Sequence, residues 1–273
     1  GTISMSSENV RLEFKNHIAI VTLDRPDKRN ALNEQMFSSL EAYIKEIETN
    51  RPRALVLTGA GDKAFCAGFD VHPDNPMNNH MLQAAAKKDT ALALKSIGRI
   101  RAVADVLLSL PVPIIAAVNG LAFGGGAEIA VRCDLRVMDP RAVICFSETR
   151  LGLMPDFGGT PSLVRLVGPS IAADLILTAR KVSAREALDL KLVNRVSAPG
   201  KAFEEAFALA KTIAANGPRA VRAALEVIRK SLDLPLEKAL ALELDRAAIL
   251  VASGEFIYGV SAFLEKKPPE FPE

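Results

Sequence analysis

The spacing of apolar residues near the start of the chain predicts two strands followed by a helix. Residues 10–14 and 17–23 are short runs of partly alternating apolar and polar positions, joined by Lys15 and Asn16, which is typical of a β-hairpin. The polar segment 24–30 contains a proline and predicts a loop. From Asn33 onward apolar residues recur at helical spacing and predict an amphipathic helix; they are Met36, Leu40, Ile44 and Ile47.

Further along, short apolar runs are separated by longer helical patterns. Residues 54–58 and 114–118 predict buried strands. Between them, residues 71–78 are rich in Pro and Asn and are expected to be mobile, whereas residues 79–110 predict one helix. Pro111 and Pro113 end that helix because proline cannot continue it. Strands separated by helices at this spacing favour βα units and a sheet covered by helices, so the fold class is α/β.

After residue 159 the pattern becomes almost wholly helical. Ser183 and Glu186 have the spacing of a capping box, which predicts a helix through Leu190. Pro218 and Pro235 lie where further helices are expected to start. We therefore expect residues 5–195 to form an α/β core with the active site, and residues 196–273 to form a helical C-terminal region.

Composition and charge narrow the possible functions. The sequence has 273 residues, of which 49% are hydrophobic and 24% charged, with a formal net charge of +2. So small a charge gives no electrostatic support for binding nucleic acid or a membrane surface. No apolar run reaches the roughly 20 residues that span a bilayer, and no secretory signal is visible. The three cysteines lack metal-ligand spacing, so we expect no metal site, and reduced thiols suit a cytoplasmic location.

Two glycine-containing loops are candidates for binding a negatively charged group. Three consecutive glycines, 124–126, lie where a strand meets a helix. Such a turn lets the backbone approach a ligand, and the free N–H groups of a helix N-terminus favour a phosphate or a developing oxyanion. Tight packing of helix on strand is an equally good explanation. If the N–H of Phe69, in the second loop, faced that of Gly125, the two would form an oxyanion hole.

Three acids near these glycines are candidates for acid–base chemistry. Glu128 and Glu148 lie 20 positions apart, each after a predicted buried strand, so their carboxylates could meet in one pocket. Each also has a structural alternative. The carboxylate of Glu128 could be stabilised by the dipole of its own helix. Glu148 could pair with Arg150 or Arg132, and Asp156 could be the N-cap of the following helix.

Five motifs taken together resemble the enoyl-CoA hydratase/isomerase (crotonase) superfamily. The resemblance covers nearly the whole chain, about residues 10–271. In chain order the motifs are Arg25-Pro26 with Asn30-Ala31-Leu32, Phe65-x-Ala67-Gly68-x-Asp70, Ala117-Val118-Asn119-Gly120 with Gly124-Gly125-Gly126-Ala127-Glu128, Phe146-x-Glu148-x-x-x-Gly152-Leu153-x-Pro155 with Gly158-Gly159-Thr160, and Ala262-Phe263-Leu264-Glu265-Lys266.

The resemblance implies a fold, a ligand and roles for individual residues. The fold would be the crotonase (ClpP-like) fold, a spiral of ββα units whose helical C-terminal region assembles a trimer or a dimer of trimers. The substrate would be an acyl thioester of coenzyme A, with no separate cofactor. Phe69 and Gly125 match the positions that hold the thioester oxygen, and Glu128 and Glu148 match the acid/base pair. Substrate or CoA contacts would come from Lys28, Arg29, Ala31, Ala67, Gly68, Asp70, Gly124 and Pro155.

This chemistry suits hydration of an enoyl-CoA, because two carboxylates around one water and two N–H donors supply a base, an acid and an oxyanion site. Hydratases of the family mostly carry Gly where this chain has Asp156. Dienoyl-CoA isomerases match Glu148 and Asp156 but carry Asp at the position of Glu128. Double-bond isomerisation using Asp156 is therefore an alternative. Others are thioester hydrolysis and a non-catalytic relative that binds a CoA ligand or RNA.

Overall fold

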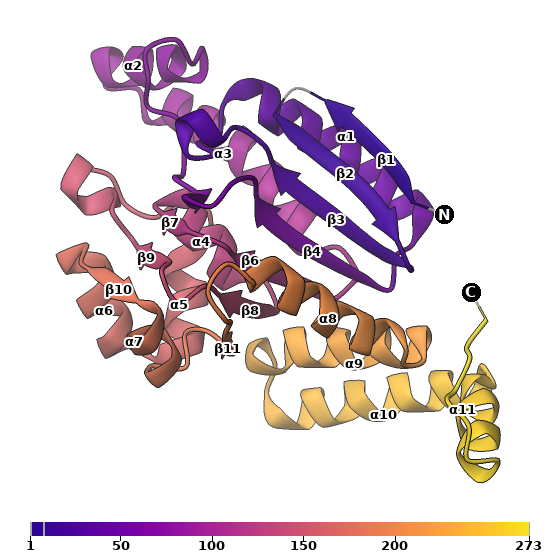
Figure 1. The fold of residues 1–273 in the computed structure, drawn as a ribbon. Coiled ribbons are helices and arrows are strands. Elements are labelled where there is room, and N and C mark those ends of the chain that lie inside the picture. Colours follow the sequence, from indigo (N-terminus) through magenta and orange to yellow (C-terminus); the bar gives the residue numbers. More distant parts are fainter. Residues whose placement is uncertain (1, 8, 273) are drawn as a thin grey trace.

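The computed structural model describes residues 2–7 and 9–272, and in these residues the strands form two sheets (Figure 1). The larger sheet has the order β1-β2-β3-β4-β6-β8-β11 and the smaller one β10-β9-β7-β5. The strands of the larger sheet are β1 (Ile3–Ser7), β2 (Val10–Lys15), β3 (Ile18–Leu23), β4 (Ala54–Gly59), β6 (Ile114–Val118), β8 (Leu135–Met138) and β11 (Arg195–Val196). The smaller sheet contains β5 (Ala64–Cys66), β7 (Leu121–Phe123), β9 (Val143–Cys145) and β10 (Lys181–Ser183).

The chain visits the two sheets in turn, which makes a spiral of ββα units. β4 is followed by β5, β6 by β7 and β8 by β9, and each pair places one strand in each sheet. The predicted hairpin is confirmed as β2 and β3, which pair antiparallel with Leu12 opposite Val21. From β3 to β8 the larger sheet is parallel, which confirms the predicted βα units and the α/β class.

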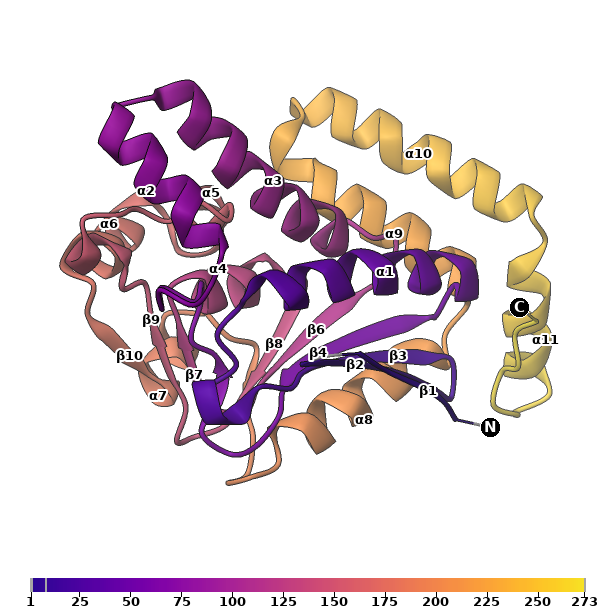
Figure 2. The same ribbon diagram turned by 90° about the horizontal axis from the view of Figure 1, so that it is seen from above.

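Helices cover both faces of the larger sheet, and this explains why its central strands are apolar at nearly every position. α1 (Glu34–Asn50) and α3 (Thr90–Leu108) lie on one face and α8 (Ala202–Ala214) on the other (Figure 2). Alternate strand residues divide between the two cores, so that Leu55 and Leu57 belong to the first and Val56 to the second. The helix predicted from Asn33 is confirmed, with Asn33 accepting a hydrogen bond from the N–H of Met36.

The single helix predicted over residues 79–110 is wrong, because the structure has two. α2 (Met77–Lys87) ends where Lys88 adopts a left-handed conformation, with φ of 51°. Asp89 then begins α3 by accepting a hydrogen bond from the N–H of Leu92. An acid followed by Thr90 is an N-cap signal, which interrupts what otherwise appears as one continuous helical pattern.

Among the remaining helices, those that begin near Ser183, Pro218 and Pro235 follow the predicted starts. The remaining helices are α4 (Gly125–Arg132), α5 (Gly159–Val167), α6 (Pro169–Thr178), α7 (Ala184–Asp189), α9 (Pro218–Lys230), α10 (Leu236–Ala252) and α11 (Glu255–Leu264), with short 3₁₀ turns η1 (Pro26–Lys28), η2 (Glu148–Leu151) and η3 (Ser231–Asp233). The capping box is confirmed, since Ser183 accepts a hydrogen bond from the N–H of Glu186. Pro218 is the first residue of α9, and Pro235 directly precedes α10.

The C-terminal helices extend away from the two sheets, with α10 and α11 outermost (Figure 1). Glu255 anchors α11 by accepting hydrogen bonds from the N–H groups of Arg219 and Ala220, at the start of α9. The division of the chain near residue 195 stays a prediction, although α8 beyond it packs on the larger sheet. No single described helix is long and apolar enough to cross a membrane; α10 and α11 pass by length and composition only as a pair, bent by 73°.

Candidate active site

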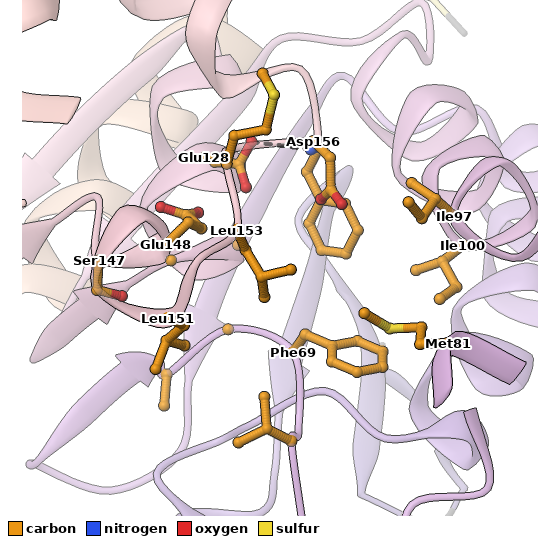
Figure 3. A pocket seen from close by; sticks show the side chains of 17 residues that line it. Phe69, Met81, Ile97, Ile100, Glu128, Ser147, Glu148, Leu151, Leu153 and Asp156 are labelled. Carbon is orange, nitrogen blue, oxygen red and sulfur yellow. Dashed lines mark hydrogen bonds between the residues drawn. The ribbon is translucent and has the colours of Figure 1, made fainter. Parts of the chain in front are cut away.

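A pocket opens between the loops that follow the smaller sheet and the helices α2 and α3 (Figure 3). Carboxylates gather at one end of it, while apolar side chains form the opposite wall (Figure 3). Its lining residues are Ala67, Gly68, Phe69, Val71, Met81, Ile97, Ile100, Gly124, Gly125, Glu128, Ser147, Glu148, Leu151, Leu153, Met154, Asp156 and Phe157. The structure therefore brings together all three predicted acids and both predicted oxyanion-hole residues.

The backbone around Phe69 turns its N–H away from the neighbouring strand. Leu32 forms an isolated parallel bridge with Phe69, in which the N–H of Leu32 donates to the carbonyl of Gly68 and its own carbonyl accepts from Asp70. These two bonds use the backbone groups on either side of Phe69, so the N–H of Phe69 faces away from Leu32. Phe69 also lines the pocket. Gly125 begins α4, so its N–H has no acceptor within that helix.

Glycines allow the two loops to approach each other. Gly68 has φ of +93°, and a Cβ there would lie 2.8 Å from the carbonyl oxygen of Phe123 and 3.0 Å from the nitrogen of Gly125. A Cβ on Gly126 would lie 2.0 Å from the carbonyl oxygen of Cys66, so tight packing explains that glycine. Gly68 and Gly126 thus bring the Phe69 and Gly125 segments side by side.

Glu128 is buried, with 1% of its surface exposed, and its carboxylate is held by a neighbouring turn. Its Oε1 accepts hydrogen bonds from the N–H groups of Phe157, at 2.8 Å, and of Gly159, at 3.0 Å. Gly159 must lack a side chain, because a Cβ there would lie 2.3 Å from Cγ of Glu128. The side chain does not cap its own helix α4; it bonds instead to the first residue of α5.

Glu148 lies at the start of η2 with 9% of its surface exposed, and Figure 3 shows its carboxylate beside that of Glu128. Among the described residues, no other residue donates a hydrogen bond to either of its oxygens, apart from Glu128 when that group is protonated. Pairing of Glu148 with Arg132 is not found, because Arg132 pairs with Asp105 at 2.7 Å. The second alternative, a pair with Arg150, is also not found in the described residues.

Burial raises the pKa values of both carboxyls of this pair. Burial is the largest cause for Glu128, and the nearby Glu148 raises the pKa of Glu128 further, against the two N–H bonds that lower it. Burial also raises the pKa of Glu148. Two close carboxylates in a low-dielectric site resist ionising together, so the pair favours one shared proton near neutral pH.

Asp156 lies in the same pocket, half-buried, and burial raises the pKa of its carboxyl while the charge of Arg101 opposes that shift. Its predicted role as an N-cap is wrong, because Gly158 occupies the N-cap position of α5 and makes no side-chain bond. The sequence could not separate these positions, since Asp156 and Gly158 both precede the helix. Asp156 is therefore a third carboxyl available to a bound ligand (Figure 3).

The residues predicted to bind the CoA part divide into two groups. Ala67, Gly68 and Gly124 line the pocket, and Pro155 is buried within its loop. Lys28 is exposed at the end of the turn η1, and Arg29, also exposed, follows it near Ala31. This segment is held to the pocket loop because the N–H of Ala67 donates to the carbonyl of Arg29.

Asp70 differs from the other predicted contacts because its carboxylate is already engaged within the protein. It accepts hydrogen bonds from the guanidinium of Arg25 at 2.7 Å and from the N–H of His72.

The prediction from the sequence missed Phe157 and the apolar side chains Leu151, Leu153 and Met154. Leu151 and Met154 are more than 60% exposed, and such a run of apolar residues in an acidic loop is the signal that could have identified them.

Comparison with known proteins gives one consistent family. The family model for enoyl-CoA hydratase/isomerase matches residues 13–273. YngF of Bacillus subtilis is 40% identical over 262 residues, covering 95% of this chain and 96% of that protein. The short-chain-enoyl-CoA hydratase of Clostridium acetobutylicum is 37% identical over 267 residues, covering 97% and 98%. The crystal structure of an enoyl-CoA hydratase from Bacillus anthracis superposes with a TM-score of 0.86 at 33% identity, covering 97% and 99%.

Proposed function

The chain belongs to the enoyl-CoA hydratase/isomerase family, and we propose that it adds water across the double bond of a trans-2-enoyl-CoA thioester. The observation that carries this proposal is the pair of buried glutamates, Glu128 and Glu148, side by side and without a counter-cation in the described residues. The names of the Clostridium and Bacillus anthracis relatives also favour hydration.

The proposed reaction uses the shared proton of the pair. The ionised carboxyl takes a proton from the bound water, whose oxygen attacks C3 of the enoyl group. The electron pair of the double bond moves to the thioester oxygen, where the N–H groups of Phe69 and Gly125 stabilise the enolate. The protonated carboxyl then delivers its proton to C2. The product has gained one water, the pair again holds one proton, and coenzyme A enters only as part of the substrate.

The direct test is to mix the protein with trans-2-enoyl-CoA thioesters of several chain lengths and follow loss of the conjugated thioester absorbance. Turnover is expected for at least one length, and its absence at every length would contradict the proposal. Release of free thiol instead would indicate hydrolysis. Retention on an RNA column at moderate salt, without turnover, would indicate a non-catalytic RNA-binding relative.

Isomerisation of an enoyl- or dienoyl-CoA is the second candidate, and Asp156 is the observation that favours it. This half-buried carboxyl with a raised pKa lies in the same pocket as the glutamate pair. Replacing Asp156 with Asn separates the two functions. A hydratase that uses only the glutamates should keep kcat within about threefold, whereas an isomerase that moves a proton through Asp156 should lose about 100-fold or more. Both reactions are measured on the same purified variant.

We further propose that the chain assembles with copies of itself through its outer helices. Large apolar side chains on α10 and α11 are more than half exposed, and contiguous patches of this kind mark interaction surfaces. They include Leu236, Leu240, Leu244, Ile249, Ile257, Phe263 and Leu264. The first three are spaced four residues apart and share one face of α10.

The assembly is tested by sedimentation equilibrium. We expect a mass three or six times that of the 29.2 kDa chain. Replacing Leu240 and Leu244 together with Glu should give a monomer, because two charges would be buried in the interface. Lys238→Glu on the same helix, where the side chain is exposed and polar, serves as the control and should leave the mass unchanged. A double variant that keeps the mass would place the interface elsewhere.

A further inference from the structure

The position of the Glu128 carboxylate depends on a neighbouring backbone turn, which must itself be held in place by other contacts. Both hydrogen bonds to its carboxylate come from backbone N–H groups, of Phe157, directly after Asp156, and of Gly159, the first residue of α5. Backbone donors can aim at the carboxylate only while the turn stays in place. Figure 3 shows Glu128 bonded to this turn at the carboxylate end of the pocket.

Arg132 also contacts this turn, at its Phe157 carbonyl and at Gly158. It lies at the last position of α4, one helical turn beyond Glu128, and its Nη1 donates to the carbonyl of Phe157 at 2.6 Å. Gly158 has φ of +83°, and a Cβ on it would lie 3.0 Å from the guanidinium carbon of Arg132. The guanidinium therefore packs directly on the turn whose two neighbouring N–H groups bind Glu128.

Asp105 holds the guanidinium of Arg132 in place through an ion pair. Its Oδ1 lies 2.7 Å from Nη2 of Arg132, so the fork of Arg132 joins the Phe157 carbonyl to a carboxylate on α3. Asp105 also lies 3.4 Å from Nε of Arg101. α3 carries Ile97 and Ile100, which line the apolar wall of the pocket. One continuous set of contacts thus runs from the helix beside the ligand to the catalytic carboxylate.

We propose that Arg132 and Asp105 are positioning residues, which hold the 157–159 turn against Glu128 and tie it to α3. The inference rests on the proposed function, in which Glu128 exchanges a proton with the substrate or water. Arg132 acts through the Phe157 carbonyl and not as a counter-ion, because its ion-pair partner in the described residues is Asp105. The charged groups around Glu128 are Glu148 on η2, Asp156 in the loop, Arg132 on α4, and Arg101 and Asp105 on α3.

Replacing Arg132 with Gln, or Asp105 with Asn, should release the turn and weaken both N–H bonds to Glu128. We expect kcat for hydration to fall about 100-fold in Arg132→Gln and about 10-fold in Asp105→Asn, with KM changed less than threefold. The N–H bonds favour the ionised carboxylate, so their loss raises the pKa of Glu128. The limb of the kcat profile that Glu128 sets should therefore move to higher pH, which a general loss of stability would not cause. Arg132→Lys keeps one hydrogen-bond donor, so its kcat should lie between those of the wild type and Arg132→Gln.

The control is Arg165→Gln, since Arg165 is an arginine of α5, directly beyond the same turn, and pairs with Asp233 at the surface. It should leave kcat and the pH profile unchanged. If Arg132→Gln does not fold, the Asp105→Asn variant tests the proposal. Asparagine has nearly the same shape as aspartate, and Asp105 is partly exposed, so this variant should fold. Variants that keep kcat within twofold and the wild-type pH profile would overturn the proposal.

A second measurement separates this inference from the proposed function. Titration of the ligand-free protein with ¹³C-labelled glutamate carboxyls reports the pKa of Glu128 whatever reaction the enzyme catalyses. An upward shift in both variants, and not in Arg165→Gln, supports the network even if the wild type hydrates no enoyl-CoA. An unmoved Glu128 titration overturns it.

Discussion

Replacing Glu128 with Gln is expected to lower kcat for enoyl-CoA hydration about 1,000-fold. The amide oxygen can still accept the N–H bonds of Phe157 and Gly159, so the fold should survive. The amide cannot take or give the proton that Glu128 shares with Glu148 in the proposed mechanism. General acid–base catalysis of this kind contributes 10²–10⁴-fold. The variant should therefore bind substrate with little change in KM while almost no turnover remains.

The matched experiment compares Glu128→Gln, Glu148→Gln and the double variant by kcat and thermal unfolding. Because the proposed mechanism uses the two carboxyls as one unit, the double variant should be little slower than either single one. Glu41→Gln, at an exposed position on α1, is the control and should behave as wild type. More than a tenth of wild-type kcat in Glu128→Gln would refute a role for this carboxyl in proton transfer.

Replacing Gly68 with Ala should produce the second largest loss, about 100-fold or more in kcat. The new Cβ would meet the backbone of Phe123 at 2.8 Å and of Gly125 at 3.0 Å, and backbone atoms cannot rotate away as side chains do. The loops that carry the N–H groups of Phe69 and Gly125 would have to separate. Losing one oxyanion donor typically costs 10²–10³-fold in kcat.

The same substitution should also lower the free energy of unfolding by about 1–3 kcal/mol, because Gly68 has φ of +93°. Gly98→Ala is the control: Gly98 lies within α3, and a Cβ there meets no atom within 4 Å. That variant should be more stable by about 0.5–1 kcal/mol, with unchanged turnover, since alanine favours a helix over glycine. Urea unfolding and kcat measure both effects. Wild-type turnover in Gly68→Ala would exclude the proposed oxyanion hole.

Much of the framework could be predicted because local chemistry and burial agree there. The strand at residues 114–118 is apolar at every position, and Ser183 caps its helix as its spacing to Glu186 predicts. The break between α2 and α3 was missed because the sequence pattern on both sides is helical. Only the left-handed Lys88 and the cap at Asp89 interrupt it, and a single residue's conformation leaves little trace in a periodic pattern.

The site was only partly predictable, for a related reason. Glu128 drew attention because a charge among apolar neighbours needs a purpose or a partner. Arg132 and Asp105 could not be paired from the sequence, because their contact joins two helices 27 positions apart in the chain. Ile97 and Ile100 belong to a helix that also faces the core, so periodicity alone cannot say which apolar residues meet a ligand.

The alternation of the chain between two sheets has a consequence for the order in which the protein becomes functional. The Phe69 loop follows β5, the Gly125 turn follows β7 and Glu148 follows β9, so three successive repeats each supply one wall. During synthesis, a chain that ends before Gly159 already contains both proposed oxyanion donors and both glutamates, yet lacks a group that fixes Glu128. The proposed site therefore cannot be complete before Gly159 has been added, and each of the three repeats contributes residues to the pocket.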